Sequence, residues 1–280
     1  MGWLGRLSLH YVRNDRNGQA HTGAHDHHEG PLRVLRRLYP EGPAVCHHVL
    51  VHPPGGIVGG DELQVDARLD AGTHALVTTP GATRFYRSDG APALQQTRLR
   101  VATGARLEWL PMETIAHSGC LATNCITAEL EPGAEMMGWD VLALGLAAAG
   151  QPFEHGAFTQ QLELPGQWLE RGRVAADDRT LLHGPLGWAG HTVSATLWFA
   201  AGTALPTARR TALVEAAREL ARSSALAATA GATAPQPGVV LLRVLAGQVE
   251  PVMQLLAAVR AAWRQQAWGL AAQPPRIWRT

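Results

Sequence analysis

The stretch "LDAGTHALV" at residues 69–77 decides the fold, because a tight glycine turn joins the end of one strand to the start of another. The same layout recurs in "VATGARLEWL" at 101–110 and in "LEPGAEMMGW" at 130–139. One glycine stands at each turn, at roughly even spacing: Gly72, Gly104 and Gly133. The repetition predicts stacked turns, as in a β-solenoid or a layered β-sandwich. Ordinary hairpins with glycine corners are the alternative, and the pattern alone leaves both open.

Most of the chain alternates apolar and polar residues with period two, which is typical of strands with one buried and one solvated face. In the segment 63–70, Leu63, Val65, Ala67 and Leu69 alternate with polar residues. The same alternation recurs at 96–102, 124–131 and 192–202.

Helical periodicity occurs only late, at 207–229 and 251–268. Pro251 stands where a first helical residue is expected and Gly269 provides the stop, while 239–247 has the composition of a buried strand. The segment 228–238 is expected to be an exposed linker. These patterns predict a mainly β protein: a single β-rich domain over residues 1–280, of layered or β-helical character, with two α-helices in its C-terminal half. Residues 1–28 are expected to be flexible.

Composition and charge restrict the function classes. The 280 residues carry a formal net charge of +1, so the chain lacks the basic excess of a nucleic-acid-binding protein. Three cysteines (Cys46, Cys120 and Cys125) argue for a reducing compartment and for structural thiols rather than a disulfide scaffold. The N-terminus lacks the apolar core of a signal peptide, and the longest apolar run, 141–150, is too short to span a bilayer. We therefore expect a soluble cytoplasmic protein.

The segment "HPPGGIVGGD" at 52–61 is rich in glycine, but we do not expect it to bind phosphate. A phosphate-binding loop of the Walker type ends in Gly-Lys-Ser/Thr, whereas Asp61 and Glu62 follow here and would repel an anion. A dinucleotide loop opens a helix, and a strand follows instead. We interpret the loop as two double-glycine corners that place Asp61 toward a cavity or a partner. The corner glycines are Gly55, Gly56, Gly59 and Gly60.

Two groups of histidines are candidate metal ligands, because imidazole and carboxylate groups bind nickel, zinc and copper. The tract 21–28 contains His21, His25, His27 and His28 and is expected to be either an accessory metal site or a solvated loop. In the second group, Cys46 and His48 are expected to share one face of a strand, with His47 on the other. Metal binding and a structural buried pair both remain open for this group.

No segment predicts a nucleophile or a catalytic site, since the chain contains no Gly-x-Ser-x-Gly elbow and no cysteine-protease signature. Among the acidic residues, Asp140 stands out, because a carboxylate beside such an apolar strand is costly to bury without a partner. An exposed position at the start of the strand is the alternative.

Several segments taken together resemble the urease accessory protein UreD (UreH) family. They are 39–61, "TTPGATRFYRS" at 78–88, "LEWLPMETIAHSG" at 107–119, "GQWLERGRV" at 166–174 and "GPLGWAGHTVSATLWFAAG" at 184–202. The order also matches, and the resemblance covers roughly residues 28–270.

The resemblance implies a mostly β fold and a protein that is not an enzyme. It implies a maturation factor that binds UreF, the GTPase UreG through UreF, and apo-urease. In this family, a passage through the protein is the proposed route of nickel to the urease active site. Nickel would bind transiently, no cofactor would be tightly bound, and GTP would enter only through the partner GTPase. A pure interaction scaffold on apo-urease, without nickel passage, is the alternative function; a metallohydrolase using His25, His27 and His28 is a third.

The resemblance also implies site residues. Asp61, Thr83 and Asp140 match family positions and are expected to line the passage, where oxygen ligands would hold nickel weakly. Cys46, His47 and His28 match further family positions and join this expected lining. Arg84, Tyr86 and the four loop glycines are expected to be structural parts of the motifs. The family usually has glutamine where Met112 stands, which removes one polar group from this chain.

Overall fold

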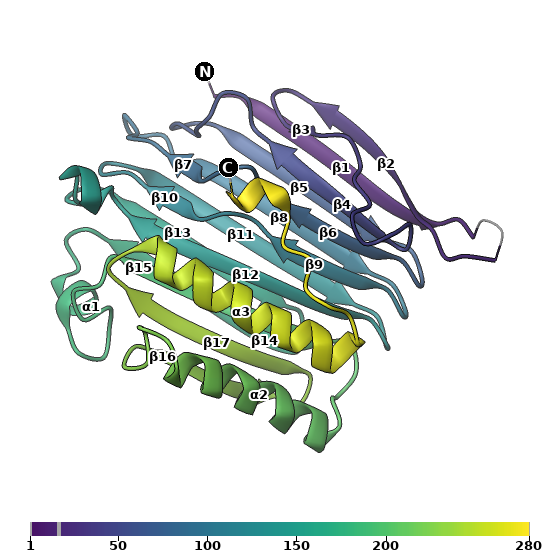
Figure 1. Cartoon of the computed structure of the whole chain (residues 1–280). Helices are drawn as coiled ribbons and strands as arrows, with labels where there is room; N and C mark the ends of the chain where they lie inside the picture. The colour runs from purple at the N-terminus through teal and green to yellow at the C-terminus, as the bar shows by residue number, and fades with distance from the viewer. Residues whose placement is uncertain (1, 16–17, 280) are drawn as a thin grey trace.

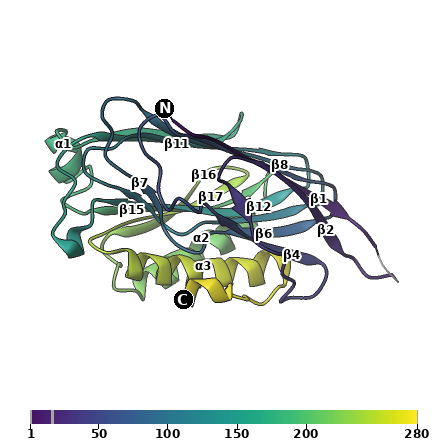
Figure 2. The ribbon, with the colours of Figure 1, turned by 90° about the horizontal axis from the view of Figure 1, so that it is seen from above.

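Two stacked β-sheets, with helices on one side, make up the computed structural model, which describes residues 2–15 and 18–279 (Figures 1 and 2). The outer sheet has seven strands in the order β14 (Trp168–Ala175), β13 (Ala157–Leu164), β11 (Leu121–Leu130), β8 (Ala93–Val101), β5 (Glu62–Leu69), β1 (Leu4–Arg13) and β2 (Thr22–Glu29). Along its main path, the helix-covered sheet has the order β16 (Ala230–Gln236), β17 (Val239–Ala246), β15 (Val193–Ala201), β12 (Glu135–Leu144), β9 (Arg106–Leu110), β6 (His74–Thr78), β4 (Val45–Val51) and β3 (Arg33–Val34). Two short strands complete it: β10 (Thr114–Ala116), which pairs with β12, and β7 (Thr83–Phe85), which pairs with β10.

The three glycine turns carry the chain from one sheet to the other. They connect β5 to β6, β8 to β9 and β11 to β12, and the strands on each side of the turns pair in parallel. The turns stack on one another, since the amide of Gly72 donates to the carbonyl of Thr103 at 3.2 Å. All three glycines have φ between 68° and 80°, a conformation that residues with a Cβ rarely adopt. Stacking is therefore confirmed, and the hairpin alternative is wrong.

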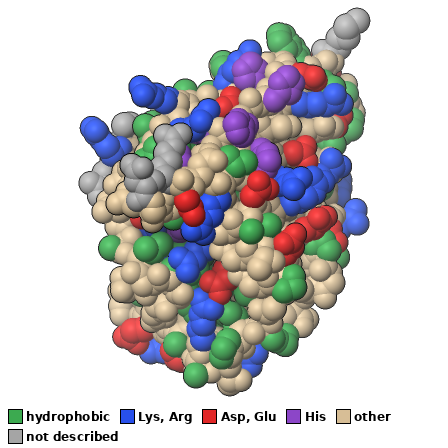
Figure 3. Space-filling model, turned by 90° about the vertical axis from the view of Figure 1, so that its right-hand side faces the viewer, with side chains coloured by type: hydrophobic (Ala, Val, Ile, Leu, Met, Phe, Trp, Pro, Cys, Tyr) green, Lys and Arg blue, Asp and Glu red, His purple; other side chains and the backbone are tan. Residues whose placement is uncertain are grey.

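The main apolar core lies between the sheets. Alternate residues of the outer sheet point inward, for example Leu7, Leu9 and Tyr11 on β1, while their neighbours face solvent. Strand β12 is buried on both faces, because the helices cover the far side of its sheet. Figure 3 shows the end of the molecule that carries the stacked turns, where acidic and basic side chains are interspersed.

The two predicted helices are confirmed as α2 (Thr207–Arg222) and α3 (Val249–Trp268), which pack on the helix-covered sheet (Figure 2). Helix α2 ends earlier than predicted, and α3 starts at Val249, so that Pro251 is its third residue. Gly269 ends α3 in a left-handed conformation, as expected. A short α-helix, α1 (Arg179–His183), and two 3₁₀ turns, η1 (Ala147–Ala149) and η2 (Arg276–Arg279), were not predicted because none spans two full turns of periodic sequence.

Two predictions about flexible segments are wrong. The segment 1–28 is not a flexible leader over its described residues, since β1 lies between β5 and β2 and most of β2 falls within it. The alternating Leu7, Leu9 and Tyr11 provide the buried face that holds it there. The segment 228–238 is not a linker either, because it forms the edge strand β16 beside β17 and α2. Its small residues and Pro235 suit an edge position.

A network of buried charges joins α3 to the strand layers. Glu108 on β9 is fully buried and lies 2.6 Å from Arg260 Nη2, 3.3 Å from Arg264 Nε and 3.0 Å from His74 Nε2. Burial alone would raise the pKa of Glu108, but the two arginines and His74 outweigh it and lower the pKa to about 2. Arg264 also reaches Glu41 at 2.7 Å, which connects the segment before β4 to the same helix.

Replacing Glu108 tests this network. We expect Glu108→Gln to lower the free energy of unfolding by roughly 3–5 kcal/mol, because it leaves the buried Arg260 without its carboxylate partner and leaves Arg264 with Glu41 alone. Denaturant unfolding measures the change. The matched control is Glu129→Gln, which removes an exposed carboxylate 3.7 Å from Arg100 and should cost less than about 1 kcal/mol. Equal losses in the two variants would contradict the assignment.

Candidate functional site

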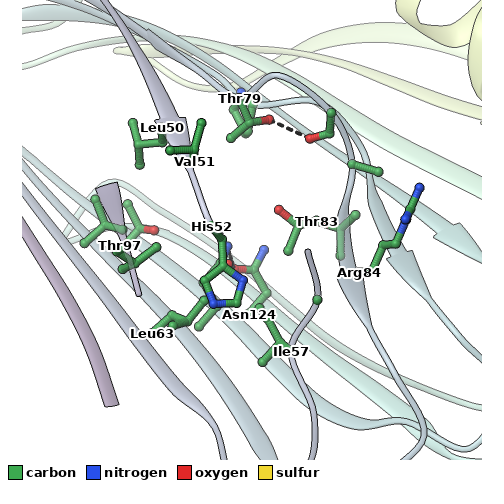
Figure 4. A pocket seen from close by; sticks show the side chains of 18 of the residues that line it. Leu50, Val51, His52, Ile57, Leu63, Thr79, Thr83, Arg84, Thr97 and Asn124 are labelled. Carbon is green, nitrogen blue, oxygen red and sulfur yellow. Dashed lines mark hydrogen bonds between the residues drawn. The ribbon is translucent and has the colours of Figure 1, made fainter. Parts of the chain in front are cut away.

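A cavity of about 350 Å³ lies between the two sheets, at the end opposite the stacked turns (Figure 4). The loop after β4, the segment 79–84 and the inward faces of β5, β8 and β11 form its walls. Most lining residues are apolar. The polar ones are His52, Thr79, Thr83, Arg84, Gln95, Thr97, Thr114, Asn124 and Asp140.

Asp140 lies deep in this cavity, in the middle of β12 rather than at its start, and is only 5% exposed. The Asn124 amide donates to its Oδ1 at 3.2 Å, and the Gln160 amide donates to its Oδ2. Burial raises the pKa of Asp140 to about 6, against an ordinary value of 3.8, although the hydrogen bond from Gln160 opposes the shift. The exposed alternative is therefore wrong: the carboxylate is buried with two amide partners.

Asp140 belongs to a row of polar side chains that crosses the interior. In the outer sheet, Gln95, Asn124 and Gln160 are neighbours in register; in the helix-covered sheet, Asp140, Thr196 and Arg243 are neighbours in register. Glu170 on β14 completes the row, because it accepts hydrogen bonds from Thr196 at 3.4 Å and from Arg243. We call these seven residues the polar row. It leads from the cavity to Arg243, which is exposed at the other side of the sandwich.

The sequence analysis missed most of this row, although the alternation contains a signal for it. Gln95 is in phase with the buried Leu99 and Val101, and Asn124 is in phase with Ile126 and Ala128. A polar residue at an inward position of an alternating strand therefore marks the row. His52, which also lines the cavity, was noted in the sequence but not placed among the expected lining residues.

Asp61 has a structural role in the glycine loop. Its carboxylate accepts hydrogen bonds from the amides of Trp3 (2.8 Å) and Val58 (3.0 Å), and the side chain is not part of the cavity lining. The carboxylate fastens the glycine loop to the segment before β1, and a place for Asp61 in a passage stays a prediction.

The loop glycines serve close approach and turning. A Cβ on Gly56 would lie 2.0 Å from Cε2 of Tyr86, and one on Gly59 would lie 2.3 Å from Oγ of Ser88. Gly55 and Gly60 have φ of 78° and 89°. The two double-glycine corners therefore exist as predicted, with Gly55 and Gly56 at the cavity.

Thr83 and Arg84 both line the cavity, beside the loop (Figure 4). The amide of Thr83 donates to the carbonyl of Glu113 at 2.9 Å, which fixes β7 beside β10. Tyr86 is exposed and stacks on His117, with ring centroids 4.7 Å apart.

Cys46 and His47 lie on β4 outside the lining of this cavity, and their expected place in a passage stays a prediction. The prediction about their faces is confirmed: Cys46 and His48 face the core between the sheets, and His47 faces Glu41 on the helix side. His48 Nδ1 lies 2.8 Å from the Tyr11 hydroxyl, and burial lowers the pKa of His48 to about 4. Burial also raises the pKa of Cys46 to about 11, so this thiol is protonated at neutral pH.

The histidine tract lies on the edge strand β2 and its side chains diverge. His25 and His27 lie opposite His10 and Ser8 on the solvent side, whereas His28 lies opposite the inward Leu7 and is not part of the cavity lining. His21 precedes the strand and packs against Tyr39. Across residues 2–15 and 18–279, no three His, Cys, Asp or Glu side chains converge into a potential metal site. Metal binding by the tract stays a prediction.

Two sheets joined by stacked glycine turns, with a polar row inside, define a mainly β scaffold with an internal cavity. The chain belongs to the UreD family, since the family model described as "UreD urease accessory protein" matches residues 4–279. It is 62% identical over 280 residues to the urease accessory protein UreD of Leptothrix cholodnii, with both chains fully covered. The UreD proteins of Methylibium petroleiphilum and Variovorax paradoxus are 58% and 55% identical, again with full coverage of both chains. None of the described helices is long and apolar enough to cross a membrane.

The raised pKa of Asp140 predicts a specific pH dependence of stability. Between about pH 4 and pH 6, the folded protein holds a proton on Asp140 that the unfolded chain releases. This contribution to the free energy of unfolding is present near pH 4 and lost as the pH rises past 6. Asp140→Asn removes the titrating group, so the variant does not lose stability over this range. Its free energy of unfolding, relative to that of the parent protein, should therefore rise by about 2–3 kcal/mol between pH 4 and pH 7.

Urea unfolding of both proteins at several pH values measures this difference. Asp66→Asn, on the solvent side of β5, is the control for loss of charge alone. A stability difference between Asp140→Asn and the parent that does not change with pH would contradict the buried, raised carboxyl group.

Proposed function

We propose that this protein is a cytoplasmic urease maturation factor that acts as a scaffold and as a conduit for nickel. In this proposal it assembles with UreF, and through UreF with the GTPase UreG, and passes Ni²⁺ to apo-urease. Nickel is the cargo rather than a resident cofactor, and GTP is bound and hydrolysed only by the partner. The observation that carries the proposal is the polar row, which connects the cavity to the far side of an otherwise apolar sandwich.

The chemistry of the row suits a cation in transit. The Asp140 carboxylate is ionised at neutral pH, since its pKa is about 6, and it lies in a poorly solvated place that attracts positive charge. Carboxylate, hydroxyl and amide oxygens are weaker nickel ligands than thiolate or imidazole, so an ion could leave each position as readily as it arrives. Asn124 and Gln160 hold the carboxylate in place, and Glu170 offers the next acidic group.

The revised roles refine the family-based expectation. Thr83 and Asp140 remain proposed contacts of the ion, whereas Asp61 acts on the shape of the loop beside the cavity. Because Asp61 holds two backbone amides, its replacement should disturb the loop rather than a nickel contact.

A pure interaction scaffold remains the second candidate, and one observation favours it. Most of the cavity lining is apolar, including Leu50, Ile57 and Trp109. Trp3, Val58 and Tyr86 are also exposed around the glycine loop, and exposed apolar groups of this kind are common at protein interfaces. In this alternative, nickel never enters the sandwich.

Blocking the cavity distinguishes the two functions. Thr97 is fully buried and lines the cavity, so Thr97→Phe should fill part of it and abolish urease activation if nickel passes through. Asp140→Asn should lower activation by about 10-fold or more through loss of the anionic contact. The measurement is urease activity and nickel content in cells whose operon lacks its own UreD, with pull-down of UreF and urease as the test of assembly.

Thr123→Phe is the matched control, because Thr123 lies on the solvent side of β11 in the same sheet. Lost activation in Thr97→Phe and Asp140→Asn with intact complexes supports the conduit. Normal urease activation in both variants would contradict the conduit and favour the scaffold function.

A further inference from the structure

We propose that Trp278, in the C-terminal tail, positions one wall of the cavity from outside the sheet. The tail, residues 270–279, returns from the end of α3 across the helix-covered sheet (Figure 1). The Trp278 ring packs against Trp139, with centroids 5.1 Å apart, and the Arg260 guanidinium lies 5.5 Å from the ring centroid. The tail is thereby held on the helix side of the helix-covered sheet. The opposite side of the same sheet lines the cavity.

The first link from Trp278 to the cavity runs through Thr78. The indole Nε1 of Trp278 donates to Thr78 Oγ1 at 2.8 Å, and Thr78 Oγ1 donates to the carbonyl of Leu110 at 2.6 Å. Thr78 is the last residue of β6 and directly precedes the segment 79–84 that lines the cavity. One indole hydrogen bond therefore acts on the residue from which this wall segment begins.

A second link runs through Trp139. Its Nε1 donates to the carbonyl of Pro111 at 2.6 Å, and Pro111 lines the cavity. The amide of Met112 donates to Thr79 Oγ1 at 2.9 Å, which ties the two wall segments to each other. Because Trp139 points outward and its neighbour Asp140 points inward, only one strand layer separates the tail from the carboxylate that lines the cavity.

These contacts make Trp278 a positioning residue. It touches neither the cavity nor its contents, and it acts through Thr78 and Trp139 on Thr79, Thr83 and Pro111. The consequence for nickel transfer rests on the proposed function, whereas the effect on the wall is a property of this chain alone.

Hydrogen exchange of the full-length protein tests the effect on the wall. Trp278→Phe keeps an aromatic ring but removes the indole donor, and we expect amides in 79–84 and 112–114 to exchange about 5-fold faster or more. Thr78→Val removes the acceptor and should have the same local effect. The matched control is Trp268→Phe, which removes an indole donor to Glu135 at the stacked-turn end of the same sheet. Unchanged exchange in the wall segments, or equal acceleration in the control, would overturn the inference.

Urease activation separates this inference from the proposed function. If Asp140→Asn impairs activation and Trp278→Phe impairs it with UreF still bound, both hold. If Asp140→Asn impairs activation but Trp278→Phe does not, the positioning role is wrong and the conduit stands. If neither variant affects activation, the conduit fails and the role of Trp278 in nickel transfer fails with it, while the exchange data still decide whether Trp278 holds the wall.

Discussion

The structure depends on one buried carboxylate. Glu108 has no contact with solvent, and two arginines of α3 meet it through the outward face of β9. A buried ion pair of this kind adds little net stability over an apolar contact, but separating the partners is costly because it leaves a buried charge unpaired. It therefore fixes the position of α3 on the sheet. The tail that follows α3 is placed by the same contact, since Arg260 also lies against Trp278.

The cavity depends on which side chains fill the space between the two sheets. The stacked turns bring the inward-facing positions of neighbouring strands into register. Inward side chains at the same level on β8, β11 and β13 therefore form one continuous row. Where these positions are apolar, the sheets close on one another. Where they are Gln95, Asn124 and Gln160, facing Asp140, amide groups occupy the interior and one carboxylate is buried among them. The proposed route of nickel follows this line of polar groups.

The sequence predicted the stacked turns well, because a glycine turn and the alternation of a strand each depend on residues that are close in the chain. The same alternation contains the polar row, because Gln95 and Asn124 stand in phase with the buried apolar residues of their strands. The role of Asp61 was not predictable in this way, since one of its partners, the Trp3 amide, lies 58 residues away. The placement of Trp278 depends on Thr78, 200 residues away, and nothing near either residue indicates the contact. The flexible leader was mispredicted because β1 pairs in parallel with β5, a partner that its own sequence does not specify.

The central claim is that nickel contacts Asp140 inside the sandwich. Anomalous diffraction at the nickel edge, from crystals of the complex with UreF soaked in Ni²⁺, tests it most directly. The account predicts anomalous density along the polar row, between Asp140 and Glu170, that disappears in crystals of Asp140→Asn. Nickel bound only at surface histidines, with an empty interior at saturating concentration, would contradict it.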